Sequence, residues 1–369
     1  MAIPVRSAYF PGPRMPAIAP SPAFHFLGTG REEGHHELSD SISIQPTTFR
    51  LPWPSSFPAA RQCRHWKEAQ ASCIELIINI RRLQAEKSKV VPDGFMLTTR
   101  VDDSPALTPK EQLIVDSAVN AAAYMTPNAS PARSRLISQL YMLLWVQDVV
   151  DEITDTLVQI VRREIPIPKQ GIYATFGLNT EILNDNNGAA CILVEEFASF
   201  ISFTREQNRS EFKGLQDFLD YRGQDIALDF ISTGIRFGNG LCLTAEEIHP
   251  LKEIINKAND HMIFVNDFYS YEKEKHAMVE ENACILNAVH YLDTVLSSGS
   301  SLAKEITMLL ILDWEARMED SLRRLETEAG LTRPQLRYAH AMVEAAAGNL
   351  LFSVTSVRYA RGHEMKEGN

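Results

Sequence analysis

Apolar and polar positions along most of the chain repeat with the period of an α-helix. One early face is typical of this pattern and consists of Cys73, Leu76, Ile77, Ile80 and Leu83. An apolar run follows from Leu136 to Val150, and no alternating apolar and polar stretch of strand length appears. Later helices are predicted over about 208–236, 244–276, 279–297, 300–329 and 332–360. The pattern therefore predicts an all-α fold.

Helix boundaries and proline content predict how the chain is organised. Thr108 and Glu111 form a capping box around Pro109, which opens a helix. Residues 1–58 hold ten of the 19 prolines, so we expect a flexible or extended leader there, partly draped over the domain, with Trp53 and Phe57 anchoring its end. Residues 59–369 are then predicted to form one helical bundle domain, long enough to enclose a central cavity.

Composition excludes several classes of protein. The chain has 369 residues, 45% of them hydrophobic and 22% charged, which is ordinary for a soluble globular protein. A net charge of −11 without a basic tract argues against nucleic-acid binding. The five cysteines are scattered and indicate neither a disulfide framework nor a zinc site. No apolar run is long enough to span a membrane and no secretory signal is present, so we expect a cytoplasmic protein.

Candidate chemistry begins with Asn266, Ser270 and Glu274, which are spaced i, i+4, i+8. On a helix these residues stack one turn above the next and offer an amide carbonyl, a hydroxyl and a carboxylate. Such hard oxygen ligands suit Mg²⁺, and the adjacent Lys273 can hold a phosphate as a point charge. The preceding turns are apolar, so this polar ladder should be buried and should need partners.

A second candidate is the acidic cluster that follows Trp145. Asp148, Asp151, Glu152 and Asp155 fall on one side of a helix, where like charges destabilise each other unless a cation compensates them. A solvated acidic turn at a helix end would explain these residues equally well. The cluster by itself therefore does not decide between the two interpretations.

The two segments together resemble the metal-binding motifs of class I terpene synthases. The ladder matches the motif (N/D)D-x-x-(S/T)-x-x-(K/R)E at every position. The family's aspartate-rich motif D-D-x-x-D aligns with residues 147–151, but its first Asp is Gln147 here, a much poorer Mg²⁺ ligand. Either Asp151 holds metal with help from Gln147, or Asp148 and Glu152 do so on a rotated helix. We favour Asp148 and Asp151 as the ligands.

Two further segments are similar to diphosphate-binding segments of that family. Arg222 and Asp225 match its diphosphate-sensing Arg and linker Asp, and Ile226 stands where a small helix-breaking residue is more usual. Residues 348–359 match the fungal ending G-N-x-x-W-S-x-x-S-x-R-Y, with Phe352 in place of Trp. This resemblance implies that Arg358 and Tyr359 bind diphosphate oxygens.

The resemblance implies a fungal sesquiterpene cyclase that acts on a prenyl diphosphate with three Mg²⁺ ions. Arg222, Lys273 and Arg358 would stabilise the departing diphosphate of C15 farnesyl diphosphate. The aromatic candidates for stabilising the carbocation through their ring faces are Trp145, Phe264 and Phe352. Antiparallel homodimers are common among relatives, so a homodimer is possible.

Three alternatives stay open. A C20 substrate would make the protein a diterpene synthase. A chain-elongating prenyltransferase shares the fold but carries a second aspartate-rich motif, which the N/S/E ladder replaces here. The substitution at Gln147 also fits a degenerate homologue that binds isoprenoids without turnover, although the intact ladder argues against such decay.

Overall fold

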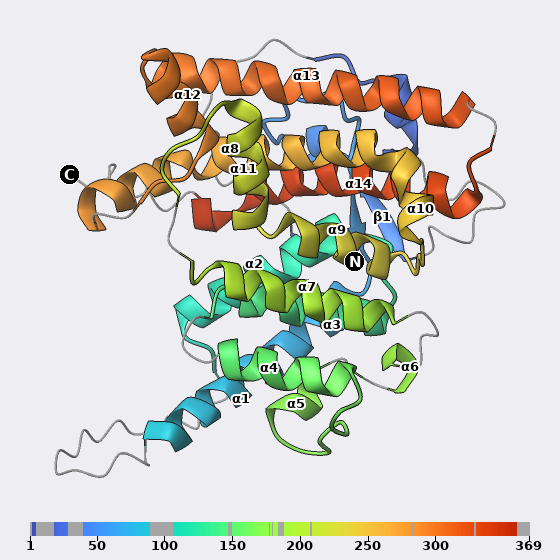
Figure 1. The fold of residues 1–369 in the computed structure, drawn as a ribbon, viewed down its shortest axis with the longest axis vertical. Coiled ribbons are helices and arrows are strands. Elements are labelled where there is room, and N and C mark those ends of the chain that lie inside the picture. Colours follow the sequence, from blue (N-terminus) through green and yellow to red (C-terminus); the bar gives the residue numbers. More distant parts are fainter. Residues whose placement is uncertain are drawn as a thin grey trace.

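The structure is a computed structural model that describes residues 2–4, 18–28, 40–88, 106–146, 150–176, 178, 180–183, 188–206, 209–281, 284–327 and 330–359. Within these residues helices dominate, as the sequence predicts (Figure 1). In chain order the elements are η1 (Pro22–Leu27), β1 (Ser41–Ile44), η3 (Pro46–Phe49), β2 (Ala60–Cys63), α1 (Trp66–Ser88), α2 (Pro109–Met125), α3 (Pro131–Leu143), α4 (Val150–Val161), α5 (Ile172–Thr175), α6 (Thr180–Leu183), α7 (Ala189–Phe203), α8 (Leu215–Asp225), α9 (Leu228–Gly238), α10 (Ala245–Ile248), η4 (His249–Leu251), α11 (Lys252–Glu281), α12 (Ala288–Leu296), α13 (Ser300–Thr327) and α14 (Arg333–Thr355).

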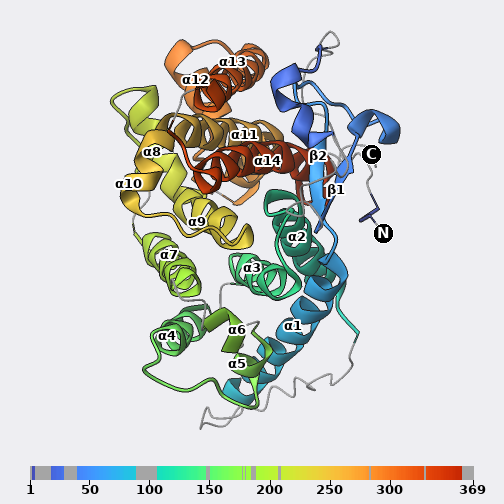
Figure 2. The ribbon, with the colours of Figure 1, turned by 90° about the vertical axis from the view of Figure 1, so that its right-hand side faces the viewer.

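The helices stack on one another along the long axis of the molecule. α11 packs between α13 and α14, α14 continues the contact to α2, and α2 packs on α3 and α1. α9 and α7 join this stack on a second side, and α4 covers α7 (Figure 2). The all-α fold predicted from the sequence is therefore confirmed, with α11 near the centre of its upper half (Figure 1).

Local sequence signals set several helix ends. The capping box predicted at Thr108 is present, with Glu111 accepting from the backbone N–H of Thr108 at 2.7 Å. A second capping box joins Thr332 and Gln335 at the start of α14. Two predicted boundaries were wrong. The helix over 208–236 is broken into α8 and α9, and α12 begins nine residues later than predicted, at 288 rather than 279.

The described part of the proline-rich leader packs against the helices. Phe24, Leu27 and Phe57 are buried in the common hydrophobic core. The backbone N–H and hydroxyl of Ser56 both donate to Glu315 of α13, at 2.6 and 2.7 Å. The leader also supplies β1, which pairs antiparallel with β2, the small sheet that periodicity did not predict. The boundary at residue 58 stays a prediction.

Hydropathy of the helices bears on membrane insertion. Taken singly, none of the helices in the described residues is both long and apolar enough to cross a membrane. The pair α12 and α13, bent by 119° at their junction, meets that criterion by length and composition only.

Candidate active site

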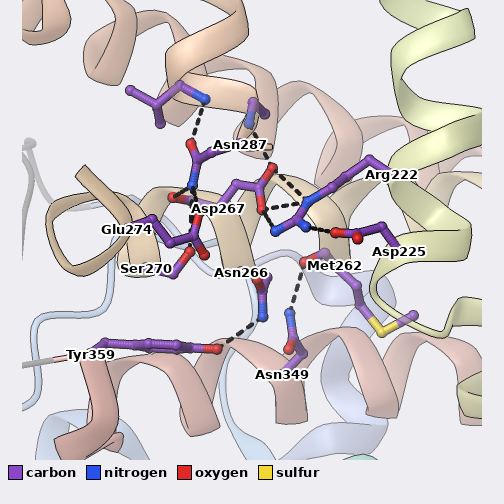
Figure 3. Close-up of polar contacts among 12 residues, drawn as sticks. Arg222, Asp225, Met262, Asn266, Asp267, Ser270, Glu274, Asn287, Asn349 and Tyr359 are labelled. Carbon is purple, nitrogen blue, oxygen red and sulfur yellow. Dashed lines mark hydrogen bonds and ion pairs between the residues drawn. The ribbon is translucent and has the colours of Figure 1, made fainter. Parts of the chain in front are cut away.

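The polar ladder lies in the middle of α11, at the helical spacing that the sequence predicts. Asn266 donates from its amide nitrogen to the hydroxyl of Tyr359 at 2.9 Å, so its amide oxygen is the atom left to face a cation (Figure 3). Ser270 is 1% exposed, and Glu274 follows one turn later on the same side of the helix. The three side chains thus form a continuous row of oxygen donors along one helix.

Asn287, the residue that precedes α12, closes this row from outside α11. Its amide nitrogen lies 3.0 Å from Oε2 of Glu274, 3.4 Å from Oγ of Ser270 and 2.9 Å from the backbone oxygen of Asp267 (Figure 3). The sequence analysis missed this residue. Asn is a preferred N-cap, which could have marked it as a helix start, but no local pattern shows what its amide nitrogen contacts.

Arg222, near the end of α8, is buried between two carboxylates (Figure 3). It donates to Asp267 from Nε at 3.0 Å and from Nη2 at 2.6 Å, and its Nη1 pairs with the predicted partner Asp225. Burial acts to lower the pKa of Arg222, but Asp267, Glu274 and Asp225 outweigh it and raise that pKa. Burial conversely raises the pKa of Asp267, which Arg222 opposes. The guanidinium is therefore a fixed positive charge beside the ladder.

The helix that carries Arg222 breaks directly after Asp225. Ile226 ends α8 with φ −101° and ψ 15°, and Ala227 adopts a left-handed conformation with φ 63° before α9 begins. The break lies at the position where the resemblance places a helix-breaking residue, although Ile226 is not small. Because Asp225, Ile226 and Ala227 all line the cavity described below, the break brings irregular backbone to the site.

The C-terminal segment reaches the same place from α14. Asn349 donates to the backbone oxygen of Met262 on α11 at 3.1 Å. Gly348 contacts α2 so closely that a Cβ at this position would overlap the backbone carbonyl of Tyr124. Burial raises the pKa of Tyr359 to about 12, so its phenol stays protonated and can donate. The similarity of this segment to the fungal ending therefore includes residues with packing roles.

A cavity of about 270 Å³ lies where these elements meet. Its polar lining includes Asn266, Lys273, Glu274, Arg358 and Tyr359, all predicted from the sequence. Asp225 and Asn349 also line the cavity. The rest of its wall is mostly apolar and is formed by Ala121, Met125, Tyr141, Leu144, Trp145, Phe200, Ile226, Ala227, Ile231, Met262 and Phe352. One end of the cavity can thus bind an anion while the wall excludes water.

Trp145 contacts a charged group of this lining. The guanidinium carbon of Arg358 lies 5.1 Å from the centre of the Trp145 ring, which is within the range of a cation–π interaction. Burial lowers the pKa of Arg358, while Tyr359 and Glu274 oppose that change. Trp145 therefore lines the cavity, as expected, but its ring face is shared with a diphosphate-binding candidate.

Several predicted residues are placed elsewhere. Phe264 is fully buried and does not line the cavity, because two residues along a helix turn it about 200° away from Met262 and Asn266. Asp151 is exposed and forms an ion pair with Arg205, two residues beyond the end of α7, instead of facing the ladder. Ser270 is likewise absent from the cavity lining and lies behind it, against Asn287. Asp148 and Gln147 lie outside the described residues.

The donor set fits a hard divalent cation in part. Asn266, Ser270 and Glu274 offer neutral and anionic oxygens, which suit Mg²⁺ when substrate phosphates and water complete the shell. In the portion of the chain that the structure describes, no group of three His, Cys, Asp or Glu residues converges. The ladder would therefore hold a metal with a single carboxylate.

Comparison with known proteins finds terpene synthases and terpene cyclases by sequence, and the same fold among solved structures. Residues 192–298 match the model of Terpene synthase family 2, C-terminal metal binding. Terpene cyclase 6 of Gibberella fujikuroi is 29% identical over 332 residues, which cover 87% of this chain and 85% of that protein. Aristolochene synthase of Aspergillus terreus is 28% identical over 202 residues, which cover 54% of this chain and 62% of that protein. The crystal structure of aristolochene synthase from Penicillium roqueforti superposes with a TM-score of 0.57 at 20% identity, covering 68% of this chain and 88% of that one.

Proposed function

Because the chain belongs to the class I terpene synthases of fungal type and is a terpene cyclase, we propose that it ionises and cyclises farnesyl diphosphate with the help of Mg²⁺. The observation that carries this proposal is the single cavity whose lining joins the ladder residues Asn266 and Glu274 to Lys273, Arg358 and Tyr359. One end is charged and the remainder is apolar. This is what a substrate with a diphosphate head and a hydrocarbon tail requires.

The charged end accounts for the departure of the leaving group. Arg358 and Lys273 line the cavity beside the ladder, and Arg222 is buried directly behind it. The diphosphate gains negative charge as it departs, so fixed positive charges stabilise it more strongly at that point. These side chains are already in place and do not have to reorganise during the reaction. Tyr359 adds a hydroxyl donor that stays protonated at physiological pH. When bound at the ladder, Mg²⁺ would supply Lewis acidity for the same bond cleavage.

The apolar wall accounts for the second half of the reaction. A carbocation left in the cavity has to fold and cyclise before water reaches it, which requires a dry lining. Phe352 and Trp145 present aromatic rings in that wall and can stabilise the cation through their faces. The choice of a C15 chain is supported by the resemblance to fungal sesquiterpene cyclases and by the similarity to aristolochene synthases.

A product assay tests this proposal. The purified protein is incubated with Mg²⁺ and C10, C15 or C20 prenyl diphosphates, and the extracts are analysed by gas chromatography–mass spectrometry. We expect a cyclic C15 hydrocarbon or alcohol that disappears with EDTA and with Asn266→Ala. Asn259→Ala is the matched control, because Asn259 also lies on α11 but contacts Ser232 outside the cavity. Turnover of the C20 substrate alone would refute the chain length, and no product from any substrate would refute the cyclase activity.

A further inference from the structure

Asn287 occupies an unusual place between two helices. It is 1% exposed and immediately precedes α12, where its side-chain oxygen accepts from the backbone N–H of Val289 at 2.9 Å. This is an ordinary N-cap. The amide nitrogen of the same side chain points the other way, into the ladder of α11 (Figure 3). One side chain therefore joins the start of α12 to the candidate metal ligands.

We propose that Asn287 is a positioning residue for the metal site, an inference that rests on the proposed function. Its amide nitrogen lies within hydrogen-bond distance of Oε2 of Glu274 and Oγ of Ser270, which are two of the three ladder groups. Both are acceptors in these contacts. A hydrogen bond to Oε2 leaves the other carboxylate oxygen of Glu274 to face the cavity.

The geometry explains why the ladder needs such support. Glu274 has a long side chain and is only partly buried, so by itself it would sample several rotamers. The same amide nitrogen of Asn287 also donates to the backbone oxygen of Asp267 at 2.9 Å, and its amide oxygen is held by the backbone N–H of Val289. Asp267 in turn accepts from the backbone N–H of Ala288 at 2.6 Å. The contacts of Asp267 with Asn287 and with Ala288 thus tie the start of α12 to α11, and they hold Asn287 in place.

The same contacts distinguish a positioning role from a purely structural one. If Asn287 only caps α12, any residue with a capping oxygen should replace it without effect on metal binding. Asn287→Ser keeps such an oxygen but has no amide nitrogen to reach Glu274. Hydrogen-bond partners of metal ligands typically change metal affinity by about 10–100-fold when they are removed. The two roles therefore predict different results for one variant.

The experiment measures thermal stabilisation of the protein by Mg²⁺ at a fixed concentration of inorganic diphosphate, a readout that does not depend on turnover. We expect Asn287→Ser to raise the Mg²⁺ concentration at half-maximal stabilisation by roughly 10–100-fold, and to lower Tm without metal less than Asn287→Ala does, because it keeps a capping oxygen. Asn287→Ala should raise it similarly and also lower Tm, because the cap is lost. Thr332→Ala, which removes the capping box of α14 away from the ladder, should lower Tm and leave the Mg²⁺ midpoint unchanged.

An unchanged Mg²⁺ midpoint in Asn287→Ser would overturn the positioning role and leave the proposed function intact. A wild-type protein that shows no stabilisation by Mg²⁺ and diphosphate would instead overturn the proposed function, and the positioning role with it. Partial recovery of turnover by Asn287→Ser at high Mg²⁺ would support the proposal, since mass action can offset weaker binding.

Discussion

The buried pair of Arg222 and Asp267 gives the sharpest prediction about stability. Asp267 is fully buried and accepts from Nε and Nη2 of Arg222 and from the backbone N–H of Ala288. In Asp267→Asn the charge is lost, and the new NH₂ group must face either the guanidinium or that N–H, both of which are donors. Among the described residues, Asp225 on the other flank would remain as the ion-pair partner of Arg222.

The magnitude follows from the burial of the two carboxylates. Removing one partner of a buried ion pair costs about 3–5 kcal/mol, because the other charge stays in a low-dielectric site. We therefore expect Asp267→Asn to lower the free energy of unfolding by about 3 kcal/mol or more. Asp225→Asn is the matched control, since it removes the other carboxylate from the same arginine. The side chain of Asp225 is 27% exposed, so its loss should cost about 1 kcal/mol.

Urea-induced unfolding followed by circular dichroism checks this difference, with the slope of the transition compared between variants to confirm that the unfolded states match. Inorganic diphosphate binding is measured in parallel, because Arg222 should bind it more weakly once Asp267 no longer fixes its orientation. Equal losses in the two variants, or a larger loss in Asp225→Asn, would refute the argument that burial decides the cost.

Three further predictions concern packing, pH and the aromatic wall. Gly348→Ala should destabilise the protein by about 3 kcal/mol, because the new Cβ would overlap the backbone of α2. In the control Gly234→Ala the new Cβ would meet only a side-chain atom of Leu193 at 3.8 Å, so this variant should be neutral or stabilising. Thermal unfolding of both variants tests this difference. Burial, with Asp220 nearby, raises the pKa of Asp260 to about 7. The folded state therefore binds this proton more tightly than the unfolded state, whose pKa is about 4. The resulting stabilisation is fully present below pH ~4 and is lost as the pH rises through about 7. Asp260→Asn should then raise stability by roughly 2–4 kcal/mol at pH ~8, with a gain that shrinks toward pH ~4; a gain independent of pH would contradict the assignment. Trp145→Leu should weaken inhibition by diphosphate about fivefold, from a cation–π contribution of about 1 kcal/mol to Arg358; a change in product distribution alone would instead indicate contact with the carbocation.

The sequence by itself determined the helical fold and most of the cavity's polar end. Local signals suffice for both, because the helical period follows from one segment and i, i+4, i+8 spacing places Asn266, Ser270 and Glu274 on one face. The capping box at Thr108 is equally local and was confirmed. The ending around Arg358 was found through its resemblance to a family, and the structure brings it to the cavity.

Tertiary structure decided which of these residues meet and which do not. Phe264 and Asp151 carried suitable chemistry, but the side of the helix that faces the cavity depends on the packing of neighbouring helices. The break at Ala227 was missed because a left-handed alanine leaves no signal in an otherwise helical pattern. Asn287 was missed for a related reason: its cap can be read locally, but its bond to Glu274 exists only because α12 turns back onto α11. Contacts between segments far apart in sequence are not encoded in any local period, so the partners of the ladder could be found only in the folded chain.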